Sequence, residues 1–116
     1  MSTLNNPQEV ELAEKLVSLH SWSDMAWFAR SGGEANSIAI RIARAATSKT
    51  NVAICGYHGW HDWYLSANHE NENNLSKHLL KGLSVDGVPK QLSGLTIPFL
   101  YNDINELKNI LSSGKV

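Results

Sequence analysis

Two consecutive glycines, Gly32 and Gly33, stand where a short apolar run gives way to a helical pattern. Ser31 precedes them, and Glu34 follows Ser31 at the spacing of a capping box. The first N–H groups of a helix have no partner inside the helix and carry the positive end of its dipole, so they bind anions such as phosphate. The glycine turn therefore allows two interpretations, a turn that only starts a helix or an anion-binding turn.

A second group of residues, Tyr57-His58-Gly59, follows the apolar run 51–55 directly. In an open parallel sheet, ligands bind outside the carboxyl ends of the strands, so we expect this turn and the glycine turn to face one pocket. The ring of Tyr57 could then stack on a planar cofactor whose phosphate sits at Gly32 and Gly33.

Metal binding is an alternative use of the same region, because His58, His61 and Asp62 are all possible ligands. No second cluster of recognised spacing accompanies them, and the neighbouring tryptophans favour packing. A metal-dependent hydrolase using these three residues stays open as an alternative. Cys55 ends an apolar run and is expected to pack rather than to react. The other histidines, for which the sequence offers no partner, are expected at the surface: His20, His69 and His78.

Apolar residues recur at helical spacing in three stretches of the chain. The first begins with Asn6 as a possible cap and Pro7 in the first turn, and Asp103 can cap the last. The helices predicted in this way run from Pro7 to about Leu19, from Glu34 to Thr47, and from Asp103 through Leu111.

Short apolar runs predict strands at 25–29 and 51–55, and a third run at 95–100 contains Pro98, which predicts a short or edge strand. Strand, helix and strand in this order predict a right-handed βαβ unit. Residues 66–94 show neither a helical nor a strand pattern. Long irregular segments are usually functional or disordered. Three strands and three helices leave sheet edges uncovered, so the chain is expected to be part of a larger α/β domain.

Composition restricts the partners of the chain. Its 116 residues carry ten Lys and Arg against eleven Asp and Glu, a net charge of −1, without a basic cluster. Binding to nucleic acid or to an anionic membrane is therefore not expected. The single cysteine, the polar start of the sequence and the lack of a long apolar run lead us to expect a cytoplasmic protein.

Taken together, these motifs resemble class III pyridoxal-phosphate-dependent aminotransferases, most closely the branch that includes glutamate-1-semialdehyde 2,1-aminomutase. The resemblance runs from about Pro7 to Leu111. Its anchors are residues 7–16, 31–36 followed by 40–44, and 57–62, with Gly87-Val88-Pro89 and Tyr101-Asn102-Asp103 in the family's order.

The resemblance implies the α/β large domain of the fold-type I transferases, which has three layers (α/β/α) and a mainly parallel sheet. It implies pyridoxal 5'-phosphate as the cofactor, a small-molecule amino donor and acceptor, and a homodimeric parent. The cofactor-binding residues would be Ser31, Gly32, Gly33, Tyr57 and His58. Many members have Ser or Thr where this chain has Gly33, so one hydroxyl contact to the phosphate is missing.

The family also implies a catalytic lysine that forms a Schiff base with the cofactor, far downstream of the matched residues. None of the lysines present has the family's context at the end of a strand. Residues 1–116 are therefore expected to be a partial large domain that is inactive alone, and a noncatalytic cofactor-binding remnant stays open as an alternative.

Overall fold

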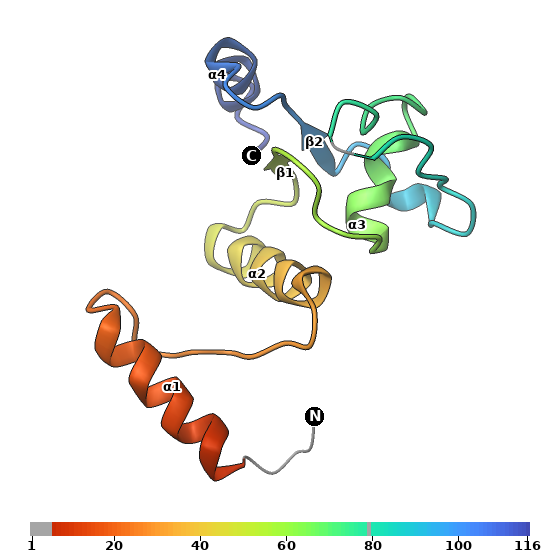
Figure 1. Cartoon of the computed structure of the whole chain (residues 1–116). Coiled ribbons are helices and arrows are strands. Elements are labelled where there is room, and N and C mark those ends of the chain that lie inside the picture. Colours follow the sequence, from red (N-terminus) through yellow and green to blue (C-terminus); the bar gives the residue numbers. More distant parts are fainter. Residues whose placement is uncertain (1–5, 79) are drawn as a thin grey trace.

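The computed structural model describes residues 6–78 and 80–116. Figure 1 follows the elements in chain order. They are α1 (Pro7–Leu19), α2 (Gly32–Thr47), β1 (Val52–Ile54), α3 (Asp62–Leu65), η1 (Ser66–Asn68), η2 (Lys90–Leu92), β2 (Thr96–Pro98) and α4 (Ile104–Ser112). Within this described part, every helix is too short or too polar to cross a lipid bilayer.

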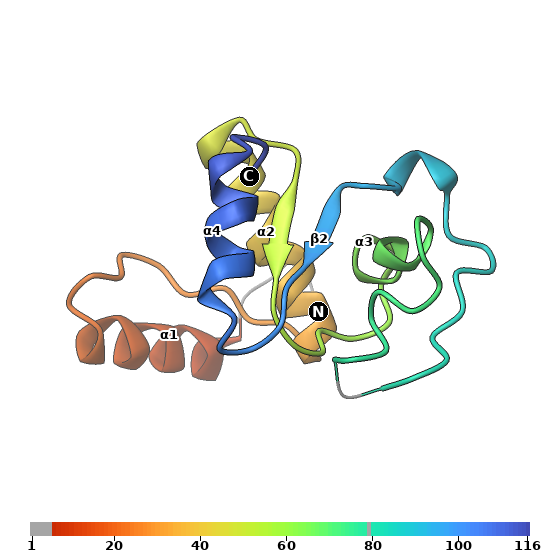
Figure 2. The same cartoon turned by 90° about the horizontal axis from the view of Figure 1, so that it is seen from above.

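The two strands form a parallel pair, with Val52 opposite Thr96 and Ile54 opposite Pro98. In Figure 1 the pair lies between α2 on one side and α4 on the other, and Figure 2 shows the strands side by side from above. The predicted α/β fold with parallel strands is therefore confirmed. The second strand ends at Pro98, as expected for a residue that cannot donate a backbone hydrogen bond.

The strand predicted at 25–29 is wrong. This segment has no regular secondary structure, and Met25 and Trp27 are 86% and 69% exposed. A strand forms only where a neighbour completes its backbone hydrogen bonds, and the described residues offer this segment no such neighbour. The expected βαβ unit with 51–55 is therefore not formed, because β1 pairs with β2 instead.

The predicted helices are confirmed together with their caps. The side chain of Asn6 caps α1, and Glu9 reaches back to the backbone N–H of Asn6, which completes a capping box. Ser31 caps α2 and Asp103 caps α4 through their side-chain oxygens, which accept from the N–H of Glu34 and of Glu106. Neither cap completes a capping box, because the two glutamates accept from Arg30 and Leu100 instead. The second helix begins at Gly32, so both glycines belong to its first turn.

The hydrophobic core is small and lies where the chain after β1 folds against the irregular segment. Its buried members are Ile54, Tyr64, Ala67 and Leu75. Tyr64 and Leu75 are fully buried. Residues 66–94 are irregular, as predicted, yet they supply half of this core.

Asn68 organises the irregular segment from inside. Its side chain is 3% exposed. Its Nδ2 donates to the carbonyl of Leu83 at 3.0 Å, and its Oδ1 accepts from the N–H of Leu75 at 2.9 Å. A buried amide whose donor and acceptor are both used replaces the hydrogen bonds that a helix or strand would provide.

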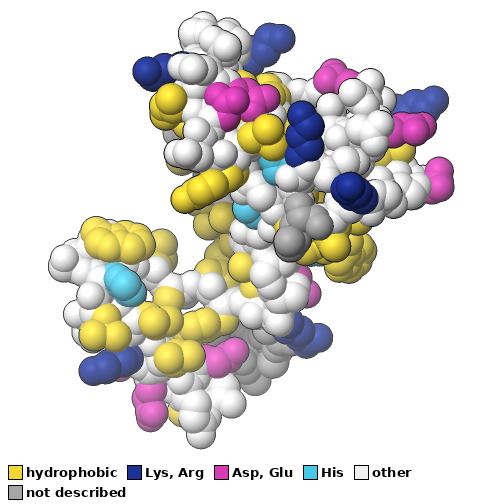
Figure 3. All heavy atoms as spheres, turned by 45° about the horizontal axis from the view of Figure 1, so that its top comes forward, with side chains coloured by type: hydrophobic (Ala, Val, Ile, Leu, Met, Phe, Trp, Pro, Cys, Tyr) yellow, Lys and Arg dark blue, Asp and Glu magenta, His cyan; other side chains and the backbone are white. Residues whose placement is uncertain are grey.

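The first helix stands apart from the rest of the described chain, and none of its residues is buried. Figure 3 shows hydrophobic side chains on the surface of the part of the chain that contains α1. The large exposed apolar residues of α1 and the following segment are Val10, Leu12, Leu19, Trp22, Met25 and Trp27. The radius of gyration is 16.5 Å, above the ~13 Å of a compact domain of about 100 residues.

Candidate functional site

The two turns singled out in the sequence lie against each other. After β1, the chain passes through Gly56 and Gly59 with φ of +92° and +103°, values that favour glycine. A Cβ placed on Gly59 would lie 3.3 Å from the Cα of Gly33. The turn at 57–59 therefore packs directly on the start of α2, and a larger residue at 59 would push it away.

The start of α2 is capped and still offers free donors. Ser31 Oγ accepts from the N–H of Glu34 at 3.3 Å, and Glu34 Oε2 accepts from the N–H of Arg30 at 2.8 Å. Among the described residues, no acceptor is found for the N–H of Gly32 or of Gly33. Ser31 thus caps the helix, but the predicted capping box is not completed, because Glu34 accepts from Arg30 rather than from Ser31. The cap leaves the N–H groups of Gly32 and Gly33 available to an anion.

Tyr57 is held on the core and remains 38% exposed. Its ring meets Tyr64 edge to face, with centroids 5.8 Å apart and an angle of 85° between the planes. The Tyr64 hydroxyl donates to the carbonyl of Gly56 at 3.3 Å. Burial, and to a smaller extent the neighbouring Tyr57, raises the pKa of Tyr64 to about 12. Tyr64 therefore stays neutral and supports the turn that carries Tyr57.

His58 is tied to the main chain of its own turn. Its Nε2 lies 2.9 Å from the carbonyl oxygen of Cys55, which can only accept, so Nε2 donates. Its ring lies 6.3 Å from the Trp63 ring and 5.9 Å from the Tyr64 ring. In this structure His58 shapes the loop that presents Tyr57.

His61 is a neighbour of the glycine turn that the sequence did not indicate. Its Nδ1 lies 3.1 Å from Ser37 Oγ, which also accepts from Trp63 Nε1 at 3.0 Å and donates to the carbonyl of Gly33 at 2.9 Å. His61 and Ser37 line a cavity of about 410 Å³ that extends to Arg30. The unusual glycine at position 33 is the one signal in the sequence that points to this contact.

His78 was expected at the surface, and that expectation is wrong. It is 5% exposed, and its Nδ1 accepts from the N–H of Gly56 at 3.0 Å. Burial lowers the pKa of His78, with a further lowering by His58 and an opposing effect of Glu106. His69 is also half-buried, whereas His20 is exposed as expected. A histidine in an irregular segment has no periodic pattern that would reveal its burial.

The metal alternative finds no support in residues 6–78 and 80–116. No three His, Cys, Asp or Glu side chains there are grouped closely enough to hold a metal ion. His58 donates from Nε2 to Cys55, His61 is engaged with Ser37, and Asp62 is exposed at the start of α3.

Known proteins similar to this chain are enzymes of amino-group transfer. A 3-aminobutyryl-CoA aminotransferase of Cloacimonas acidaminovorans is 36% identical over 113 residues, 97% of this chain and 23% of that protein. A glutamate-1-semialdehyde 2,1-aminomutase of Ignicoccus hospitalis is 36% identical over 104 residues, 88% of this chain and 23% of that protein. No protein-family model matches.

In sequence, this chain is similar to aminotransferases and aminomutases. The crystal structure of an omega-transaminase from Sphaerobacter thermophilus shares the fold, with a TM-score of 0.70 at 22% identity over 97% of this chain and 26% of that one. The resemblance stated from the sequence is thus confirmed. The chain spans about a quarter of the length of the relatives it matches.

Proposed function

We propose that this chain forms the phosphate-holding part of a pyridoxal 5'-phosphate site in an aminotransferase or aminomutase. One observation carries the proposal. In a relative of these enzymes, the unpaired N–H groups at the start of α2 lie beside the turn that presents Tyr57.

The residues present fit this cofactor chemically. Pyridoxal phosphate has an anionic phosphate and a planar ring, which match the free N–H groups of Gly32 and Gly33 and the exposed aromatic ring of Tyr57. When bound, the cofactor supplies the electron sink that makes amino-group transfer possible. This chain's own part is to bind the phosphate at the start of α2, which Ser31 caps. Tyr57 orients the cofactor ring, and His58 holds the loop that carries Tyr57.

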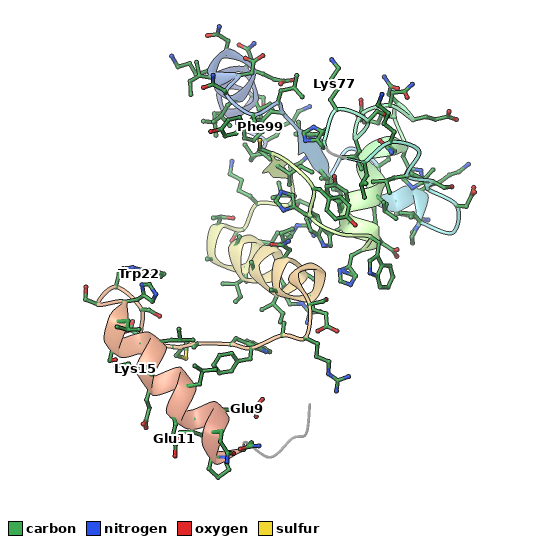
Figure 4. The ribbon with its side chains drawn as sticks, in the orientation of Figure 1. Glu9, Glu11, Lys15, Trp22, Lys77 and Phe99 are labelled. Atoms are coloured by element: carbon green, nitrogen blue, oxygen red, sulfur yellow. The ribbon has the colours of Figure 1, made fainter. Side chains whose placement is uncertain are left out.

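Within residues 6–78 and 80–116, no lysine lies beside this site to hold the cofactor. The side chains that line the cavity next to Gly33 in the described part of the chain include no lysine. Lys15 lies on α1, and Lys77 points away from α2 (Figure 4). We therefore propose that these 116 residues alone do not transfer amino groups.

The same proposal covers the cellular location, the assembly and the substrate class of the enzyme. A cytoplasmic homodimer acting on a small-molecule amino donor and acceptor agrees with the near-neutral charge and the single cysteine.

Titration with pyridoxal phosphate tests this function. The product of the gene's complete reading frame should bind the cofactor with a shifted absorbance band, and borohydride should fix it on one lysine identified by mass spectrometry. The isolated 116-residue chain should give no stoichiometric adduct. Absence of binding by the complete product would refute the proposal, and a stoichiometric adduct on the isolated chain would refute its second part. Binding without an adduct would instead support a noncatalytic cofactor-binding protein.

A further inference from the structure

We propose that the imidazole of His61 supplies the side-chain hydrogen bond to the cofactor phosphate that Gly33 cannot make. This inference rests on the proposed function and assigns a positioning residue to the same site. It concerns the one position at which the glycine turn departs from the family pattern, where a hydroxyl is common.

The space beside Gly33 is occupied by this ring. A Cβ on Gly33 would lie 2.9 Å from His61 Cε1, 3.0 Å from Nδ1 and 3.8 Å from Nε2. The distance of 2.9 Å to Cε1 is shorter than the contacts that Cβ atoms make in proteins. A Ser or Thr at position 33 and the present position of His61 therefore exclude each other, and the imidazole stands where the missing side chain would begin.

Ser37 holds the Nδ1 side of the His61 ring. The Ser37 oxygen accepts from Trp63 Nε1, and its hydroxyl lies within hydrogen-bonding distance of both the Gly33 carbonyl and His61 Nδ1. When the hydroxyl donates to Nδ1, the neutral ring carries its proton on Nε2. Among the described residues Nε2 has no hydrogen-bond partner, so its N–H is available to a ligand.

A phosphate oxygen accepts hydrogen bonds, and the N–H of His61 Nε2 can donate one. The ring then accepts at Nδ1 from Ser37 and donates from Nε2 to the phosphate. Arg30 and Glu34 line the same cavity with opposite charges, so the side-chain donor and the backbone N–H groups of the glycine turn supply the recognition of the anion.

The test compares two ligands that differ only in the phosphate. Dissociation constants for pyridoxal phosphate and for pyridoxal are measured on the complete gene product, on His61→Ala and on His61→Asn, with folding checked by circular dichroism. Asparagine retains a group near Nδ1 for Ser37 and lacks the one at Nε2. We expect pyridoxal phosphate to bind about tenfold or more weakly to both variants, and pyridoxal to bind as before.

Two further variants separate a contact with the phosphate from a purely structural role. His61→Gln places an amide N–H near the position of Nε2, so it should recover affinity relative to His61→Asn. Gly33→Ser combined with His61→Ala should also recover affinity, because the hydroxyl then has room. His20→Ala, at an exposed histidine after α1, is the matched control.

The outcomes distinguish this inference from the function on which it rests. Equal weakening of both ligands in His61→Asn, or unchanged binding of pyridoxal phosphate, would overturn the role of His61 and leave the cofactor site intact. Failure of the unchanged protein to bind pyridoxal phosphate would overturn the proposed function and this inference with it.

Discussion

The imidazole of His78 accepts a hydrogen bond at 3.0 Å from the backbone N–H of Gly56, which lies 22 residues earlier in the chain. This bond joins the irregular segment to the turn that follows β1. The glycine turn, the Tyr57 loop and the irregular segment are therefore one connected unit, and changes far from the proposed cofactor should affect its site.

The stability of the fold should decrease in acid because of His78. The acceptor role of Nδ1 requires the neutral ring, and burial lowers the pKa of His78 below its ordinary value of 6.5. A lowered pKa in the folded state means that the stabilisation is complete above about pH 6.5 and is lost as the pH falls through the folded-state value. Urea unfolding at a series of pH values measures this loss.

His78→Asn is the matched variant, because its Oδ1 can replace Nδ1 as an acceptor and does not titrate in this range. It should unfold with less dependence on pH than the unchanged protein. His58 and Glu106 lie close enough to act on His78, so equal pH dependence in both proteins would assign the effect to groups other than His78 and contradict its role.

Removal of the Asn68 side chain should disorganise the irregular segment. Asn68→Ala leaves the N–H of Leu75 and the carbonyl of Leu83 without their partner in a buried place. Each buried group left unsatisfied costs about 1 to 3 kcal/mol, so the free energy of unfolding should fall by at least that amount. Denaturant unfolding measures it, with Asn109→Ala on the exposed side of α4 as the control. A change no larger than that of the control would show that residues 66–94 do not depend on Asn68.

Tyr64 should matter through its ring more than through its hydroxyl. Tyr64→Ala removes a fully buried aromatic side chain and should cost about 3 to 5 kcal/mol. Tyr64→Phe removes only the bond to Gly56 and should cost about 0.5 to 1.5 kcal/mol. Tyr101, 90% exposed, provides the control substitution to Ala, for which thermal unfolding should be nearly unchanged. If Tyr64→Ala and Tyr64→Phe lose similar amounts of stability, the hydroxyl rather than the ring would be the main contribution of Tyr64.

Replacement of Tyr57 should weaken cofactor binding through the lost stacking. Tyr57→Ala should cost about 0.5 to 1.5 kcal/mol beyond the lost contact area, and Tyr57→Phe should bind nearly as well as the unchanged protein. Fluorescence titration with pyridoxal phosphate gives both values. If the two variants lose equal affinity, the hydroxyl rather than the ring makes the contact.

The local parts of this fold could be predicted from the sequence, and the parts that depend on distant partners could not. The caps at Asn6, Ser31 and Asp103 act within one helical turn, so their residue types were sufficient. The apolar run at 25–29 was read as a strand, because composition reports a tendency to be buried and cannot show whether a neighbouring strand is present.

The same limit applies to the candidate site. The meeting of the glycine turn with the 57–59 turn was expected from the rule for parallel sheets. The strand at 25–29 on which that expectation relied does not form, so the contact arises from the packing of the 57–59 turn on α2. The places of His61 and His78 depend on contacts across 24 and 22 residues, and no local pattern encodes such contacts. The sequence showed that a side chain is missing at Gly33, and the structure shows that His61 lies in that space.

If the cofactor phosphate binds at the first turn of α2, a negative charge at Gly32 should repel it. A Cβ at Gly32 meets no atom within 4 Å, so Gly32→Ala fits without a clash and is the control for Gly32→Asp. The alanine variant of the complete gene product should bind pyridoxal phosphate nearly as well as the unchanged protein. The aspartate variant places a like charge beside the phosphate and should bind it about tenfold or more weakly, with pyridoxal binding unchanged. Equal affinity of the two variants for pyridoxal phosphate would contradict phosphate binding at this turn.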